Sequence, residues 1–151
     1  MANTYSSLFY HFVFSTKFRK RIIKPDFENR LWTYLGGIAR KHDIKPIQIG
    51  GVEDHIHALL LSPPKYSVSQ IAKIIKSDSS KWVHQEFPNK WAFGWQDGYS
   101  AFSVSRSIVP RVVRYIRNQR QHHENVSFED EYLELLKLHE IDTVDDSYVF
   151  E

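Results

Sequence analysis

The chain has no cysteine among its 151 residues and only one methionine. Without thiols it cannot build a disulfide framework or a zinc site with thiolate ligands. No apolar stretch approaches the length of about 20 residues that a membrane span needs, and the N-terminus lacks a basic region followed by an apolar one. We therefore expect a cytoplasmic protein that has no association with membranes.

The composition is otherwise ordinary. Hydrophobic residues make up 42% of the chain and charged residues 25%, which is typical of a folded globular protein and argues against wholesale disorder. A chain of this length has room for one domain with a real core and little room for two. We interpret residues 1–151 as a single domain.

Charge is divided unevenly along the chain. Residues 1–123 hold 19 Lys and Arg against 8 Asp and Glu, a net +11, whereas residues 124–151 hold one Lys against 10 acids, a net −9. A basic body of this kind attracts polyanions, and an acidic extension can shield or tune that surface. The alternative is that two solvated halves merely neutralise each other.

Hydrophobic spacing predicts an α+β fold. Strand patterns cover residues 4–16, 44–52 and 55–61. Residues 91–104 also have the composition of a strand, interrupted by the turn dipeptide Asp97-Gly98. Helical spacing covers residues 26–43, then 67–87 after a Ser67–Gln70 capping box, then about 107–122 and a short helix from Ser127. The order is typical of a ferredoxin-like antiparallel sheet with packed helices.

Two histidines stand out in the third strand pattern. In a strand, residues two apart point to one face, so His55 and His57 project together while Ile56 points away. Neighbouring imidazoles form half of a site for a divalent metal. About 0.4 such pairs arise by chance in a chain with 8 histidines, so two hydrogen-bonded core histidines are the alternative.

Tyr115 and Gln119 lie four residues apart in the helix predicted for residues 107–122, and so share a face. Gln119 offers an oxygen ligand, and a phenol beside a metal is suited to attack on a phosphodiester. A tyrosine among apolar neighbours is more often a core residue. Other side chains compete for the third ligand position: Glu53, Asp54, His122, His123 and Glu124.

These segments together resemble the HUH single-tyrosine transposases of small prokaryotic insertion sequences and their domesticated relatives associated with repetitive palindromes. The segments that resemble this family are residues 55–60, 95–104, 115–119 and 129–132. The resemblance implies an HUH endonuclease fold, metal ligands His55, His57 and Gln119, and Tyr115 as nucleophile. It also implies Mg²⁺ or Mn²⁺, a 5′-phosphotyrosine intermediate, single-stranded DNA with a hairpin as substrate, a homodimer and no nucleotide cofactor.

Basic side chains fit such a substrate. The candidates for contacts with DNA phosphates are Lys17, Arg19, Lys20, Arg21, Lys73, Lys76, Arg114 and Arg117. Single-strand binders combine a positive groove with stacking aromatics, and Trp95, Tyr99 or Phe102 could stack on bases. Packing in the core is the more common role of such aromatics and is the alternative.

Three rival functions stay open from the sequence. The same chemistry could act on chromosomal palindromic repeats instead of a mobile element. The fold could also serve as a non-catalytic module that binds single-stranded nucleic acid. A metal hydrolase that activates water would use the histidines without Tyr115.

Overall fold

A computed structural model describes residues 2–141 of the chain. Its strands are β1 (Leu8–Ser15), β2 (Lys45–Val52), β3 (His55–Ser62) and β4 (Ser100–Val104). Its α-helices are α1 (Pro25–Lys41), α2 (Val68–Glu86), α3 (Val109–Arg117), α4 (Gln119–His122) and α5 (Phe128–Leu138). Short 3₁₀ turns lie at η1 (Lys17–Arg19), η2 (Pro88–Lys90) and η3 (Arg106–Ile108).

The four strands form one antiparallel sheet in the order β2-β3-β1-β4. Each helix that links two strands crosses one face of the sheet, which is the ferredoxin-like arrangement expected from the order of the elements. The predicted α+β fold with packed helices is thus confirmed.

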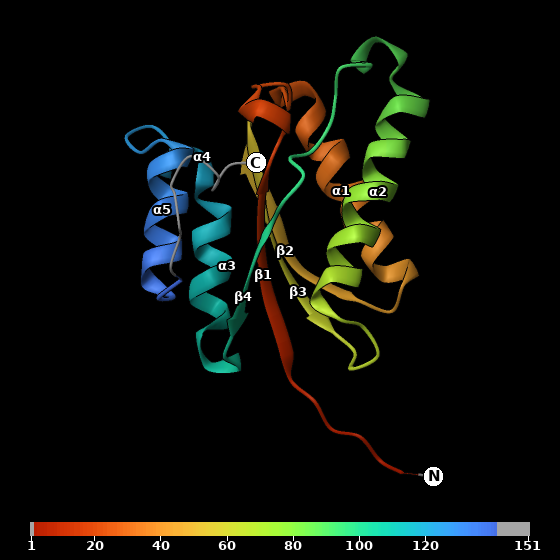
Figure 1. The fold of residues 1–151 in the computed structure, drawn as a ribbon, viewed down its shortest axis with the longest axis vertical. Coiled ribbons are helices and arrows are strands. Elements are labelled where there is room, and N and C mark those ends of the chain that lie inside the picture. The colour runs from red at the N-terminus through yellow and green to blue at the C-terminus, as the bar shows by residue number, and fades with distance from the viewer. Residues whose placement is uncertain (1, 142–151) are drawn as a thin grey trace.

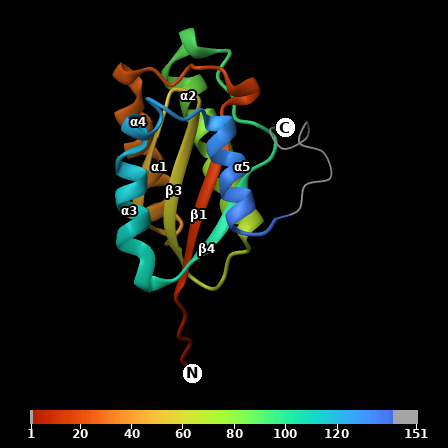
Figure 2. The ribbon, with the colours of Figure 1, turned by 90° about the vertical axis from the view of Figure 1, so that its left-hand side faces the viewer.

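Helices cover both faces of the sheet. In Figure 1, α1 and α2 lie on one side of the strands and α3, α4 and α5 on the other. The view in Figure 2 looks onto the second side, where β3 and β1 are visible between α3 on the left and α5 on the right. Because both faces are covered, β3 is buried along nearly its whole length.

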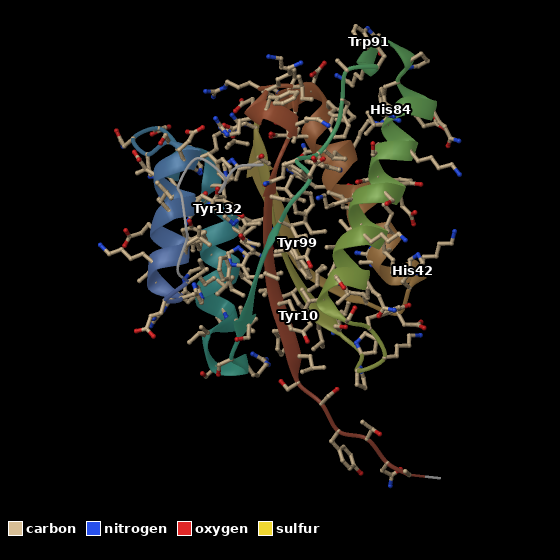
Figure 3. All side chains as sticks on the ribbon, viewed as in Figure 1. Tyr10, His42, His84, Trp91, Tyr99 and Tyr132 are labelled. Atoms are coloured by element: carbon tan, nitrogen blue, oxygen red, sulfur yellow. The ribbon has the colours of Figure 1, made fainter. Side chains whose placement is uncertain are left out.

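The two faces have different cores. Aromatic and aliphatic side chains from β1, β3, α1 and α2 form the larger cluster, among them Phe12, Phe14, Ile56 and Leu60. On the opposite face, smaller apolar clusters anchor α3 through Val109 and Ile116, and α5 through Phe128, Tyr132 and Leu136. Figure 3 labels Tyr132 on this α5 side of the sheet. The alternation along β3 therefore divides the apolar core from the face that carries His55 and His57.

Local signals in the sequence explain several boundaries. Ser67 accepts a hydrogen bond from the Gln70 N–H while the Gln70 side chain accepts one from the Ser67 N–H, so the predicted capping box opens α2. Ser127 caps α5 in the same way by accepting from the Asp130 N–H. The predicted hairpin between β2 and β3 turns at Glu53 and Asp54.

Three predicted elements differ from the structure. The first strand begins at Leu8 instead of residue 4. Of the strand predicted over residues 91–104, only Ser100–Val104 is a strand, because η2 and an irregular segment precede it. The single helix predicted from Ser107 is interrupted at Asn118, which separates α3 from α4. Ile108, rather than Ser107, is the residue at the N-cap of α3.

The acidic extension predicted for residues 124–151 contains α5, one side of which is buried against the sheet. Residues 142–151 lie outside the described range. No helix within residues 2–141 combines the length and the apolar character needed to cross a membrane.

Candidate functional site

The β2–β3 hairpin places His55 and His57 on the sheet face covered by α3, α4 and α5. Both side chains are completely buried. The hairpin is tight at this point, because a Cβ at Gly51 would overlap the carbonyl oxygen of His55. Close pairing of Gly51 with Ile56 thus fixes the start of β3 and the direction of both imidazoles.

Tyr115 and Gln119 reach the same face from α3 and α4. Gln119 is buried, and its Oε1 lies 3.0 Å from the Nε2 of His55. The Tyr115 ring packs edge-on against His57, with centroids 5.5 Å apart. The backbone break at Asn118 changes the predicted continuous helix but still brings both side chains together with the histidines.

Glu131 on α5 lies at the centre of this group, and the sequence had not singled it out as a ligand. Its carboxylate is 3% exposed, although a carboxylate is rarely so buried without partners. Oε1 faces three imidazole nitrogens: His57 Nε2 at 3.1 Å, His123 Nε2 at 3.1 Å and His55 Nε2 at 3.2 Å. Oε2 accepts hydrogen bonds from the Tyr115 hydroxyl and from Gln119 Nε2.

Each of the three histidines has a second partner at Nδ1. His55 Nδ1 lies 2.7 Å from Asp54 Oδ1, His57 Nδ1 lies 2.8 Å from His11 Nε2, and His123 Nδ1 lies 2.6 Å from the Val126 carbonyl oxygen. With a cation at Nε2, every ring could keep its hydrogen on Nδ1 and donate it to this second partner. Such outer partners orient the ligands of natural metal sites.

Electrostatic interactions in the cluster favour a protonated His55 beside an ionised Glu131. Burial alone would lower the pKa of His55, but hydrogen bonds to Asp54 and Glu131 outweigh it and raise that pKa to about 9. Burial would raise the pKa of Glu131, yet hydrogen bonds from His123, His55 and His57 hold it well below its usual range. Burial and the nearby Glu131 charge raise the pKa of Tyr115, so its proton stays on the phenol in the resting protein.

The donor set suits a divalent cation. His55, His57 and Glu131 offer ligand atoms within 4.8 Å of one another, and His122, His123 and Glu131 form a second, overlapping group. The buried Nε2 of His122 has no hydrogen-bond partner among residues 2–141 and lies 3.3 Å from Glu131 Oε2. Imidazole nitrogens with a carboxylate and an amide oxygen form a reasonable ligand set for a first-row transition ion.

Among the competing candidates for a third ligand, Asp54 and Glu53 have other positions, whereas His122 and His123 lie in the cluster. Asp54 lies behind His55 and holds its Nδ1. Glu53 points toward Arg120 and Arg21. His123 joins the cluster directly through Gln119 Oε1 at 3.0 Å.

The expected DNA contacts fall into two sets. Lys17, Lys20, Arg21, Lys73, Arg114 and Arg117 are exposed. Two others have substantial contacts inside the protein: Arg19 pairs with Glu129 at 2.7 Å, and Lys76 donates to the carbonyl oxygens of Asp97 and Gly98. Lys76 thus holds the loop before β4, a structural role that the sequence did not predict.

Of the two roles open to the aromatics, Trp95 and Phe102 take core packing, because both are buried. Trp95 also donates its indole N–H to Ser79 Oγ at 2.9 Å. Tyr99, labelled in Figure 3, is partly buried against the larger core cluster.

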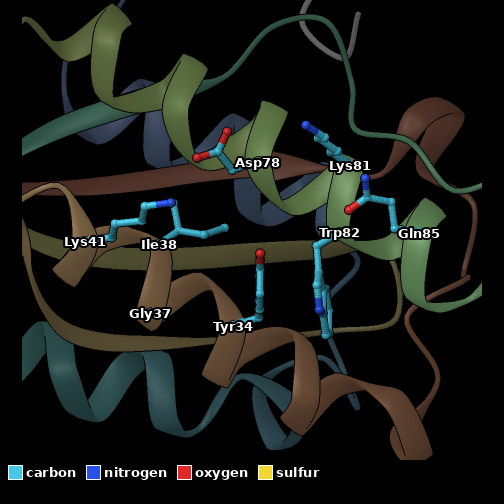
Figure 4. Close-up of a pocket in the computed structure, with 8 residues that line it drawn as sticks. All are labelled: Tyr34, Gly37, Ile38, Lys41, Asp78, Lys81, Trp82 and Gln85. Carbon is cyan, nitrogen blue, oxygen red and sulfur yellow. The ribbon is translucent and has the colours of Figure 1, made fainter.

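Among the hollows in the part of the chain that the structure describes, two bear on the choice of the site. One borders the nucleophile candidate and is lined by Tyr115, Asn118, Gln121, His122, Asn125 and Val126. The other lies between α1 and α2, where Tyr34 stacks on Trp82 with ring centroids 4.2 Å apart (Figure 4). Asp78 is the one carboxylate among the residues lining this second hollow, so they do not form a ligand set like that of Glu131.

Known structures share this fold. A crystal structure from Deinococcus radiodurans assigned as a transposase aligns with a TM-score of 0.65 at 23% identity, covering 79% of this chain and 95% of that one. A REP-associated tyrosine transposase bound to a REP hairpin aligns with a TM-score of 0.59 at 14% identity, covering 83% and 74%.

Sequence relatives agree. The chain is 24% identical over 115 residues to the ISDra2 transposase TnpA of Deinococcus radiodurans, covering 73% of this chain and 82% of that protein. It is 27% identical over 124 residues to the transposase for insertion sequence element IS200 of Salmonella typhimurium, covering 79% and 81%. A family model described as "Transposase IS200 like" matches residues 4–119. The chain therefore belongs to the IS200-like transposase family.

Proposed function

We propose that this transposase cleaves and rejoins single-stranded DNA through Tyr115. One observation carries the proposal: the Tyr115 hydroxyl and the imidazoles of His55 and His57 converge on the same buried carboxylate, that of Glu131. A phenol held beside a metal-binding group is the arrangement that attack on a phosphodiester requires.

In the proposed step, Tyr115 Oη forms a bond to the phosphorus while the bond from phosphorus to the 3′ oxygen breaks. The Glu131 carboxylate accepts the hydrogen bond from the hydroxyl and so orients it; the phenol loses its proton as the new bond forms, and the departing 3′ oxygen takes up a proton. The products are a 5′-phosphotyrosine and a free 3′-hydroxyl. Since the ester energy is retained, attack by a 3′-hydroxyl reverses the step without a nucleotide cofactor.

The candidate ligands for a divalent cation are His55, His57 and Gln119, as the resemblance implies, and we add Glu131. A bound Mg²⁺ or Mn²⁺ supplies electrophilic catalysis by polarising the scissile phosphate and neutralising its developing charge. The protein side of the site orients the imidazoles through Asp54 and His11 and keeps bulk water away by burial under α5.

We propose DNA with a hairpin next to the cleaved strand as the substrate, and a homodimer as the active form. A solved structural neighbour bound to a REP hairpin supports the first part. The exposed basic residues among the expected DNA contacts supply positive charge for the phosphates. We also propose that residues 1–151 act as one catalytic domain.

The test is a denaturing gel of the protein with end-labelled hairpin DNA from the genomic flanks of its gene, in Mn²⁺ or Mg²⁺. We expect a label that migrates with wild-type protein and is absent with Tyr115→Phe, while both bind the DNA equally. A matched control is Tyr132→Phe, on the neighbouring helix, which should still form the adduct.

Other outcomes would favour the rival functions. Cleavage without an adduct, unchanged in Tyr115→Phe, would indicate a water-activating hydrolase. Tight binding with no cleavage of any flank would indicate a binding module. Adducts formed only with dispersed chromosomal palindromes would assign the chemistry to a domesticated enzyme.

A further inference from the structure

The η1 turn that follows β1 displays an aromatic side chain to solvent. Phe18 is 73% exposed, in contrast to Trp95 and Phe102. Both Phe18 and Arg19 have left-handed backbones, with φ of 59° and 54°. Two consecutive residues other than glycine rarely adopt this conformation, and such strain is concentrated at functional sites.

The turn is held rigidly in this shape. Thr16 Oγ1 donates to the Lys20 carbonyl oxygen at 2.6 Å, closing the turn across its base. The Lys17 N–H donates to the Gly94 carbonyl oxygen at 2.8 Å, which ties the turn to the segment before β4. The backbone that carries Phe18 is thus held by hydrogen bonds on both sides of the turn.

The same turn borders the His–Glu cluster. The Thr16 N–H donates to the carbonyl oxygen of Asp54, the residue whose carboxylate holds His55. The Arg19 guanidinium pairs with Glu129, two residues before Glu131 on α5. Both elements that supply the centre of the site are therefore attached to η1, which Figure 1 shows at the end of β1 opposite the N-terminal segment.

Two ammonium groups lie beside the exposed ring. Lys17 Nζ is 5.8 Å and Lys20 Nζ 5.9 Å from the Phe18 centroid. Lys20 is exposed, and Lys17 is half exposed beside a distant Asp97 partner at 3.8 Å. An apolar ring flanked by cations matches one nucleotide of a single strand, whose base stacks while its phosphates meet positive charge.

We infer that Phe18 is the platform on which an unpaired base of the DNA strand stacks at the edge of the site, with Lys17 and Lys20 on the adjoining phosphates. This inference rests on the proposed function, because it names how that substrate is held. Phe18 is a positioning residue and makes no bond to the reacting atoms. It takes the place of the buried aromatics that the sequence suggested.

The test measures binding of a fluorescein-labelled single-stranded oligothymidylate by anisotropy, in excess chelator so that no cleavage occurs. Phe18→Ala should weaken binding about 5- to 150-fold, the range for loss of one stacked base, and Phe18→Trp should restore it. The slope of log K against log salt should stay unchanged in Phe18→Ala. In Lys20→Ala that slope should fall by about 0.7, because one phosphate contact is lost.

The matched control is Tyr5→Ala, since Tyr5 is 89% exposed but precedes β1 and so lies at the other end of that strand. It should bind as the wild type does. Wild-type affinity in Phe18→Ala, no restoration by Phe18→Trp in a folded protein, or a changed oligomeric state in Phe18→Ala would each overturn the inference.

Failure of the two proposals can be told apart. A wild-type protein that forms the Tyr115 adduct, with Phe18→Ala binding equally well, removes only the role of Phe18. A wild-type protein that binds no single strand removes the proposed function and the role of Phe18 with it.

Discussion

The hydroxyl of Tyr115 donates a hydrogen bond to the carboxylate of Glu131, which is carried by a different helix. The same carboxylate faces the Nε2 atoms of His55 and His57 through its other oxygen. One side chain thus links the nucleophile candidate to both histidines. It lies beyond residues 4–119, the part of the chain that the family model matches.

Replacing Glu131 by glutamine should lower the affinity for Mn²⁺ by more than about tenfold, because a charged oxygen ligand becomes a neutral amide. Isothermal titration on the DNA-free protein measures this directly. Glu129→Gln is the matched control, since Glu129 pairs with Arg19 and should leave the affinity unchanged. Equal titration curves for Glu131→Gln and wild type would exclude Glu131 as a ligand.

Asp54→Asn should weaken Mn²⁺ binding about 10- to 100-fold, although Asp54 is placed outside the ligand set. The carboxylate fixes the His55 ring through Nδ1 at 2.7 Å, and an amide can present its N–H there and favour the wrong tautomer. Metal affinity and the spectrum of bound Co²⁺ would both report the change. Unaltered values for both would mean that the ring is oriented by other contacts.

Stability should depend on pH through His55. Its pKa is raised from 6.5 to about 9 in the folded protein, so its stabilising contribution is complete below about pH 6.5 and is lost as pH rises through 9. A shift of this size corresponds to about 3 kcal/mol at most. Urea unfolding in excess chelator, compared between wild type and His55→Asn, should show a stability gap that shrinks from pH 6.5 to pH 9.5. A gap that is constant or widens would contradict the assignment.

Gly51→Ala should destabilise the protein by several kcal/mol, because the added Cβ would overlap the carbonyl oxygen of His55 and displace the hairpin. Gly37→Ala is the control: no atom of the described residues lies within 4 Å of its added Cβ, and removal of a glycine from a helix interior stabilises by about 0.5–1 kcal/mol. Thermal unfolding of both variants tests the pair. A Gly51→Ala protein as stable as wild type would mean that the hairpin adapts freely.

Much of the fold could be predicted because its signals are local. Alternation along residues 55–61 placed both histidines on one face, and Ser67 with Gln70 marked the start of α2. The break at Asn118 could not be predicted, because helical spacing continues through this position and the residue is not a helix breaker such as proline. Directly after the break, Gln119 Oε1 lies 3.0 Å from His55 Nε2, a tertiary contact that the local sequence does not reveal.

Glu131 was missed because acidic residues in a first helical turn ordinarily favour the helix dipole and face solvent. A signal was nevertheless present. Phe128, Tyr132 and Leu136 form the buried stripe of α5, and Glu131, three residues after Phe128, falls on the same face. A carboxylate on an apolar stripe indicates a buried partner, which here is the group of imidazoles.

The ligand atoms around Glu131 come from β3, from α4 and the residue after it, and from α5. A cation held there would fasten the C-terminal helix to the middle of the sheet, in the manner of a cross-link that chelators can remove. Binding to the folded chain alone would then raise its unfolding temperature with metal concentration. The resistance of α4 and α5 to proteases would then measure the fraction of protein molecules that hold a cation at this site.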